Sequence, residues 1–184
     1  MINRRKYIFD YLTENERDNL QNDLQNIQQI TNSTFFRVNS SAELVGQLRN
    51  IVFDQPSVIQ IISHGNYDGF GIDTVSNFVK YTELAQIFRD INRVINNQLI
   101  LNLTTVCFSA YQLSFFNKSE QKLFRLMIGS LRNSGTNGAI RHSIDIYGID
   151  ISEIKNRIDI INENSDSDPD CNVELPETCL YWIE

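Results

Sequence analysis

The sequence predicts an α/β fold in which helices cover both faces of a mostly parallel central sheet. Short apolar, β-branched segments alternate along the chain with amphipathic segments of helical period, an alternation typical of βαβ crossovers. Segment 58–62 is nearly continuous in apolar side chains, as expected of a strand covered on both faces. The chain has 184 residues, of which 41% are hydrophobic, and this is enough for one domain with a full core.

The first predicted elements are a strand and an amphipathic helix. Tyr7 to Leu12 is predicted to be the first strand. Thr13, with Glu16 three positions later, forms the pattern of a capping box, which starts a helix by satisfying its free backbone N–H groups. The helix then carries apolar side chains at helical spacing: Leu20, Leu24, Ile27 and Ile30.

The same arrangement recurs before the third strand. Residues 34–38 are predicted to be the second strand, and Ser40 with Glu43 is a second capping box. The inward side chains of the helix that follows are Leu44, Leu48 and Ile51. Pro56 ends this helix, residues 58–62 form the third strand, and a loop rich in Gly and Asp runs from His64 to Asp73.

The second half of the chain is predicted to continue the alternation. A helix from Tyr81 to Asn97 is indicated by the spacing of Leu84, Ile87, Phe88, Ile91 and Ile95, and residues 99–106 form the fourth strand. A further helix begins at Asn117 or Ser119 and ends near Gly135, with Leu123, Leu126, Met127 and Leu131 on one face. Short strands at 139–140 and 143–147 and a last helix at 151–161 complete the prediction.

The formal net charge of −7 comes entirely from the C-terminal segment. Residues 1–162 are electrically balanced, whereas residues 163–184 contain acidic side chains and no Lys or Arg. We therefore expect an α/β domain over 1–162 and an acidic segment over 163–184 that is part of, or packs on, the same domain. The absence of a basic stripe argues against nucleic acid as a partner.

Metal and membrane sites are not expected. The acidic segment follows the spacing of a calcium-binding loop, but Cys171 stands where that loop requires glycine, so a solvated acidic linker is favoured. Cys107, Cys171 and Cys179 match no zinc spacing and are expected to be thiols. No apolar run approaches the roughly 18 residues that span a bilayer, and no signal peptide is recognisable. We expect a cytoplasmic protein without cofactor, metal or membrane partner.

Two predicted strands each end at a chemically reactive side chain. His64 follows the third strand and Cys107 follows the fourth. Ligands bind at the carboxyl ends of parallel strands, because the crossover loops diverge there. If these strands are neighbours, an imidazole and a thiol meet above the sheet edge. The imidazole can take the proton of a thiol whose pKa is ordinarily ~8.5 and later protonate a leaving amine.

An oxyanion hole is predicted beside this pair. The backbone N–H of Gly65 is unobstructed, and together with the N–H of Cys107 it supplies two donors for a tetrahedral intermediate. The reaction class that these groups imply is acyl transfer, meaning hydrolysis of an amide.

These segments resemble a known family. Val58-Ile59-Gln60-Ile61-Ile62-Ser63-His64-Gly65 and Leu101-Asn102-Leu103-Thr104-Thr105-Val106-Cys107-Phe108-Ser109-Ala110 are similar to the paired signature of caspase-like cysteine proteases, in particular the bacterial CHAT and metacaspase-like branches. The likeness covers about residues 1–150. It implies a caspase-like three-layer sandwich, with His64 as general base and acid, Cys107 as nucleophile and Gly65 as an oxyanion donor.

Two departures from the family leave specificity open. The metacaspase branch has Asp two positions before its cysteine, where this chain has Thr105. A preference for a basic or acidic residue at the cleavage site is therefore not carried over. The segment expected to line the specificity pocket, 137–148, shows no recognisable pattern, so the substrate-binding residues are unknown.

Other candidate residues have simpler interpretations. A single buried cysteine or histidine is usually structural, and it is the pairing of His64 with Cys107 that favours catalysis. Asp68 and Asp73 are interpreted as turn residues, and His142 is given a surface or strand-end role. Cys171 and Cys179 are interpreted as incidental.

The favoured function is a cysteine endopeptidase acting on a protein substrate. We expect its activity to be gated by a regulatory partner, by cleavage near the acidic segment or by self-association. The family resemblance suggests a role in bacterial defence, including antiviral defence, or in cell death. The alternative is an inactive caspase-like scaffold or peptide-binding regulatory protein. A nucleotide-binding or flavodoxin-like module is weaker, because no Gly-rich phosphate loop opens a predicted helix.

Overall fold

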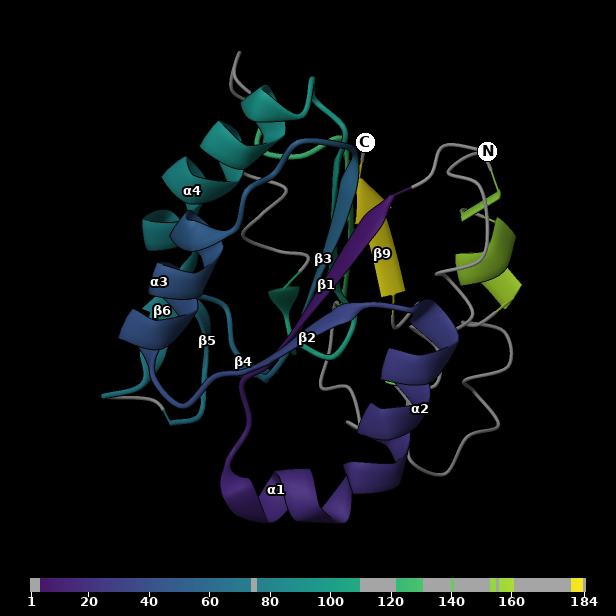
Figure 1. Ribbon diagram of the computed structural model, residues 1–184. Coiled ribbons are helices and arrows are strands. Elements are labelled where there is room, and N and C mark those ends of the chain that lie inside the picture. Colours follow the sequence, from purple (N-terminus) through teal and green to yellow (C-terminus); the bar gives the residue numbers. More distant parts are fainter. Residues whose placement is uncertain are drawn as a thin grey trace.

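A computed structural model describes residues 4–73, 76–109, 122–130, 140, 153–154, 156–160 and 180–183. Its centre is a six-stranded sheet in the order β2-β1-β3-β7-β8-β9 (Figure 1). The bounds are Thr34–Arg37 (β2), Arg5–Asp10 (β1), Ser57–Ile62 (β3), Leu99–Leu103 (β7), Leu126–Ser130 (β8) and Leu180–Ile183 (β9). All neighbouring pairs are parallel except β8 with β9, so the predicted mostly parallel sheet is confirmed.

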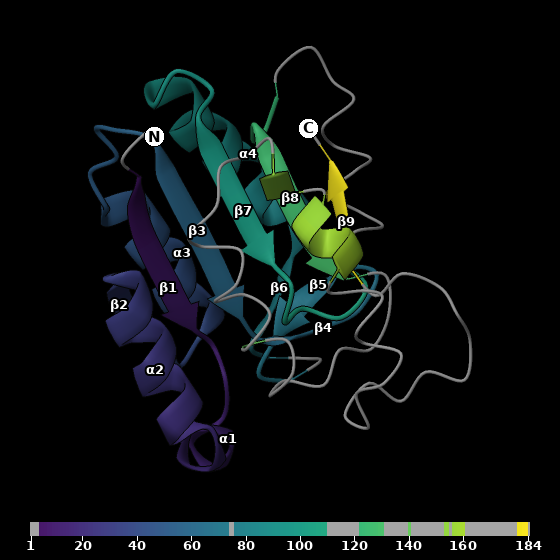
Figure 2. The ribbon, with the colours of Figure 1, turned by 90° about the vertical axis from the view of Figure 1, so that its right-hand side faces the viewer.

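Helices cover both faces of this sheet. In Figure 1, α3 (Ser41–Asn50) and α4 (Tyr81–Val94) lie on one side, and α2 (Gln21–Thr31) and the helical residues 153–154 and 156–160 lie on the other. Figure 2 looks from the α2 side, with the sheet behind α2 and in front of α3 and α4. The result is an α/β architecture in three layers. No helix within the described ranges is long and apolar enough to cross a membrane.

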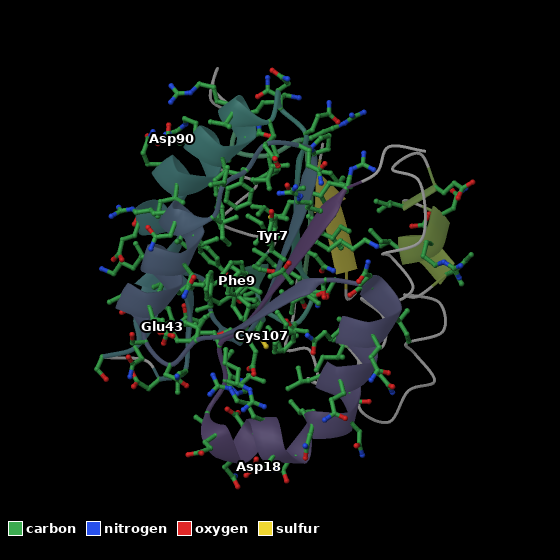
Figure 3. The ribbon with its side chains drawn as sticks, in the orientation of Figure 1. Tyr7, Phe9, Asp18, Glu43, Asp90 and Cys107 are labelled. Carbon is green, nitrogen blue, oxygen red and sulfur yellow. The ribbon has the colours of Figure 1, made fainter. Side chains whose placement is uncertain are left out.

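Alternating side chains of β1 build a core on each face. Tyr7 and Phe9 point toward α3 and α4 (Figure 3) and belong to the larger apolar cluster, whereas Ile8 belongs to the cluster of α2. The predicted apolar stripe is confirmed, because its five positions are all buried: Leu84, Ile87, Phe88 and Ile91 in α4, and Ile95, the residue after its last turn. Burial on both faces explains why strands such as β3 are apolar at almost every position.

The first predicted helix forms as two helices that meet at Leu20. Thr13 caps α1 (Glu14–Asn19) with the complete capping box, and α2 follows at Gln21. Ile30 was expected to face the core, but its side chain is 63% exposed. The inward position of the last turn belongs to Thr31, which continues the i, i+3, i+4 spacing set by Leu24 and Ile27. Thr31 is only 2% exposed.

The prediction of a helix through Leu126 and Met127 is wrong. Residues 126–130 form β8, in which Met127 pairs with Leu101 of β7. Every residue of β8 is buried, and a short run that is apolar on all sides has no period that separates strand from helix. Its pairing with β7 makes this run a strand. Residues 122–125, which the same prediction made helical, are not helical either. The rest of that predicted helix, at 117–121 and 131–135, lies outside the described residues.

The end of the chain joins the central sheet. β9 pairs with β8 in antiparallel register, so these four residues are not part of a solvated linker. Their Leu-Tyr-Trp-Ile sequence is apolar and aromatic and favours a strand. Ile140 was predicted in a strand and is helical and buried, and the predicted helix at 151–161 is confirmed for residues 153–154 and 156–160. Residues 163–179 and the predicted strand 143–147 lie outside the described residues.

Candidate functional site

The two predicted reactive residues follow neighbouring strands. β3 and β7 pair in parallel register, with Gln60 opposite Asn102. β7 ends at Leu103, earlier than predicted, and a turn then leads to Cys107, while His64 lies just beyond β3. Both segments leave the carboxyl edge of the sheet, which is where open parallel sheets bind ligands. Figure 3 shows Cys107 at this end of the sheet, on the side of α1.

The residues after β3 form a second sheet rather than the predicted loop. Its three antiparallel strands, in the order β4-β5-β6, are His64–Gly65, Gly69–Gly71 and Phe78–Lys80. A Cβ on Gly69 would stand 2.0 Å from the Val79 carbonyl oxygen, so this pairing requires glycine. Asp73 accepts backbone hydrogen bonds from Ser76 and Asn77, which confirms its turn role. His64 is therefore held on a strand.

Gly65 has its backbone N–H directed away from β5. Asn66 N donates to Gly69 O at 2.9 Å, and hydrogen-bonded and non-hydrogen-bonded pairs alternate along an antiparallel ladder. Gly65, opposite Phe70, therefore occupies a non-hydrogen-bonded position. Its N–H faces outward from the ladder, as a donor to an oxyanion must.

The Gly65 backbone lies directly against the Cys107 backbone. A Cβ built on Gly65 would stand 2.9 Å from the Cys107 carbonyl oxygen and 3.3 Å from the Cys107 nitrogen. The strand ends are also tied by a side chain, because Thr105 Oγ1 donates to Ile61 O at 2.9 Å. Thr105 is buried and holds β3 to the turn after β7. Two loops that are distant in the sequence therefore meet at the predicted site.

An aromatic pair packs at the turn of Cys107. The thiol is half-buried and is not in a disulfide. Phe108, the next residue, has a left-handed φ of 58°, and its ring packs on that of Tyr67 with the centroids 4.6 Å apart. Burial, and to a smaller extent the charge of Cys107, raise the pKa of Tyr81 at the start of α4.

The imidazole of His64 contacts the carboxylate of Glu16. His64 Nε2 binds Glu16 Oε1, and Glu16 Oε2 accepts hydrogen bonds from the Thr13 N–H and hydroxyl at 2.9 and 2.6 Å. Partial burial acts to raise the pKa of Glu16, but the hydrogen bonds from Thr13 and His64 outweigh burial and hold that pKa below its usual range. Glu16 is therefore a carboxylate at neutral pH.

Sequence reasoning assigned Glu16 only to the capping box. That role is confirmed, but the contact with His64 spans 48 residues, and no local pattern predicts it. The structure thus brings Gly65 and Cys107 together and gives His64 a carboxylate partner. His142, Cys171 and Cys179 lie outside the described residues, as does the segment 137–148 apart from Ile140. Within the described residues, no three metal-ligating side chains cluster.

Gly65→Ala should destabilise the protein by about 1–3 kcal/mol, because the new Cβ overpacks a contact between two backbones. It would stand 2.4 Å from Val106 Cγ1 in addition to its clash with Cys107. Urea unfolding measures the change. The control is Gly46→Ala in α3, where a Cβ meets nothing within 4 Å. That substitution should be neutral or stabilise by about 0.5–1 kcal/mol. Equal stability of both variants would contradict the Gly65–Cys107 contact.

Comparisons with known proteins do not assign the chain to a family. No family model matches the sequence, and no curated protein matches it significantly. The five parallel strands of the central sheet and the helices on its two faces are compatible with a three-layer sandwich.

Proposed function

We propose that this protein is a cytoplasmic cysteine endopeptidase of caspase-like fold that hydrolyses peptide bonds in a protein substrate. The observation that carries the proposal is the backbone contact between Gly65 and Cys107. This contact joins the segments that follow two adjacent parallel strands, at the sheet edge where a substrate binds.

The residues of the site have separate roles in the proposed reaction. His64 accepts the proton of the Cys107 thiol, and the thiolate sulfur attacks the carbonyl carbon of the scissile peptide bond. The N–H groups of Gly65 and Cys107 donate to the oxyanion that forms. As the C–N bond breaks, the imidazolium gives its proton to the leaving amine. Water, deprotonated by His64, then hydrolyses the thioester and regenerates the thiol.

Thr105 bears on the specificity of the proposed peptidase. Thr105 occupies the position where the metacaspase branch has an acidic residue. It is buried, and its hydroxyl donates a hydrogen bond to the Ile61 carbonyl. The preference of that branch for a basic residue before the cleaved bond is therefore not carried over, and specificity stays open. By family analogy alone, the peptidase is gated by a partner, by processing or by self-association, and it acts in bacterial defence or cell death.

The rate of alkylation of Cys107 tests the dyad. With limiting iodoacetamide near neutral pH, followed by mass spectrometry of the Cys107 peptide, His64→Ala should slow labelling by about tenfold or more, because the imidazole that accepts the thiol proton is gone. His142→Ala removes the other histidine of the chain and is the matched control. Equal, slow labelling in wild type and His64→Ala would favour the alternative, a catalytically inactive scaffold or peptide-binding regulatory protein.

A further inference from the structure

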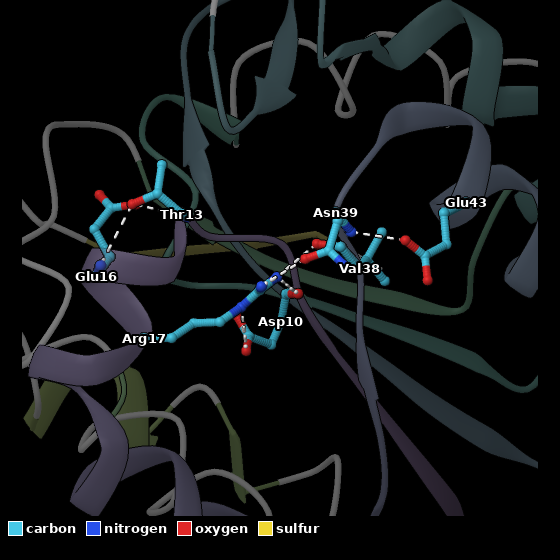
Figure 4. A network of polar contacts seen from close by, with 7 residues as sticks. All are labelled: Asp10, Thr13, Glu16, Arg17, Val38, Asn39 and Glu43. Atoms are coloured by element: carbon cyan, nitrogen blue, oxygen red, sulfur yellow. Dashed lines mark hydrogen bonds and ion pairs between the residues drawn. The ribbon is translucent and has the colours of Figure 1, made fainter.

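The two carboxylate oxygens of Glu16 make separate contacts. Oε2 accepts both hydrogen bonds from Thr13 and completes the capping box of α1. Oε1 contacts Nε2 of His64. The capping box thus fixes the side chain in the orientation in which its second oxygen reaches the imidazole. Figure 4 shows Glu16 turned back onto Thr13 at the first turn of α1.

The backbone that carries Glu16 is also anchored. Arg17, the next residue, is buried and donates to the Asp10 carboxylate at 2.9 Å and to the Val38 carbonyl at 2.6 Å. It also donates to Asn39 Oδ1 at 2.7 Å (Figure 4). These acceptors lie at the carboxyl ends of β1 and β2, at the same edge of the sheet as the candidate site. The helix that carries Glu16 is therefore held to the sheet by the hydrogen bonds of Arg17.

A carboxylate at Nε2 determines which nitrogen of the imidazole can act as a base. Glu16 accepts a hydrogen bond, so neutral His64 carries its proton on Nε2 and leaves the lone pair on Nδ1. The same carboxylate also stabilises the imidazolium that forms when Nδ1 takes a proton. We propose that Glu16 is the positioning residue of the site, which orients His64 and selects its Nε2–H tautomer. The inference rests on the proposed function, since it assigns Glu16 a role in that same dyad.

Glu16→Gln tests this role, with Glu43→Gln as the matched control. Glu43 occupies the equivalent position in α3, where it accepts a backbone hydrogen bond from Asn39 at 2.8 Å. Both variants lose one acidic charge at the first turn of a helix. Only Glu16→Gln should slow the alkylation of Cys107, by about tenfold, because only it weakens the orientation of the catalytic imidazole. Glu43→Gln should label at the wild-type rate.

Nitrogen-15 NMR of the histidine side chain supplies a readout that a merely structural role would not change. Neutral His64 of the wild type should show the Nε2–H tautomer as the dominant form, and neutral His64 of Glu16→Gln should show a mixture of the two tautomers. Assignment uses the loss of the signal in His64→Ala. A shift in tautomer together with slower labelling supports the proposal.

Three outcomes would overturn it. If His64→Ala slows labelling but Glu16→Gln behaves like Glu43→Gln in rate and tautomer, Glu16 has no positioning role and the dyad still stands. If Glu16→Gln labels faster than wild type, Glu16 restrains the imidazole instead of orienting it. If His64→Ala leaves the labelling rate unchanged, the proposed function fails and the role of Glu16 in it fails too.

Discussion

Cys107→Ala should lower the rate of substrate cleavage by at least about 10³-fold, because no other group takes over the attack on the carbonyl carbon. Alanine lacks the sulfur that forms the thioester. A cleavage-site profile of a whole-cell extract, treated with wild-type protein or with the variant, measures the effect across all the proteins of the extract at once. Peptide bonds cut only by the wild type also identify the residue before the scissile bond.

The fold should survive this substitution. Cys107 is half-buried in a turn beyond the end of β7, and alanine fits in its volume. Matching circular dichroism and thermal unfolding of the two proteins would exclude a folding defect. Cys107→Ser keeps the shape of the side chain more closely and should also be inactive, since a hydroxyl is far less acidic than a thiol. Identical cleavage profiles for wild type and Cys107→Ala would contradict the peptidase proposal.

Arg17→Met should lower the free energy of unfolding by about 3–5 kcal/mol, because it leaves a buried carboxylate without its cation. Asp10 is fully buried, and Arg17 is its partner at 2.9 Å. The substitution also removes the guanidinium hydrogen bonds to three uncharged acceptors (Figure 4): the carbonyl oxygens of Asp10 and Val38 and the side-chain oxygen of Asn39. Urea unfolding at pH 7 measures the loss.

Arg93→Met is the control for this loss. Arg93 pairs with Asp90 on the surface of α4, with 77% of the arginine side chain exposed. Exposed pairs contribute about 0–1 kcal/mol, so this variant should remain close to wild type. A similar change in both variants would show that the Arg17 network contributes no more than a surface ion pair.

The loss in Arg17→Met should also depend on pH. Burial raises the pKa of Asp10 in the wild type, and Arg17 and Arg37 offset this only in part. Without Arg17 that pKa rises further, and a carboxyl with a raised pKa destabilises the fold only while it is ionised. The part of the deficit that comes from the Asp10 carboxylate should therefore be largest above the raised pKa, shrink as pH falls through it, and vanish below the ordinary value of 3.8. The part that comes from the uncharged acceptors of Arg17 should remain. A deficit that grows as pH falls from 7 to 5 would contradict this account.

Patterns within a few residues of one another predicted most of the regular structure. The Thr13 and Ser40 helix caps and the apolar stripe of α4 formed as expected. In the second cap, the Glu43 carboxylate binds the Asn39 N–H, one residue before the cap itself. β8 was misassigned, because an apolar run of five residues fits either a strand or a buried helix until its partner is known.

The sequence by itself determined that the two reactive residues follow strands β3 and β7, because the hydrophobic pattern and the residues that end a strand are local properties of the chain. Only the tertiary structure decided that these strands are neighbours, that Gly65 touches Cys107, and that Glu16 reaches His64. Strand order and register bring such distant residues together. They follow from burying all the apolar faces at once, and no short segment of the chain specifies that outcome.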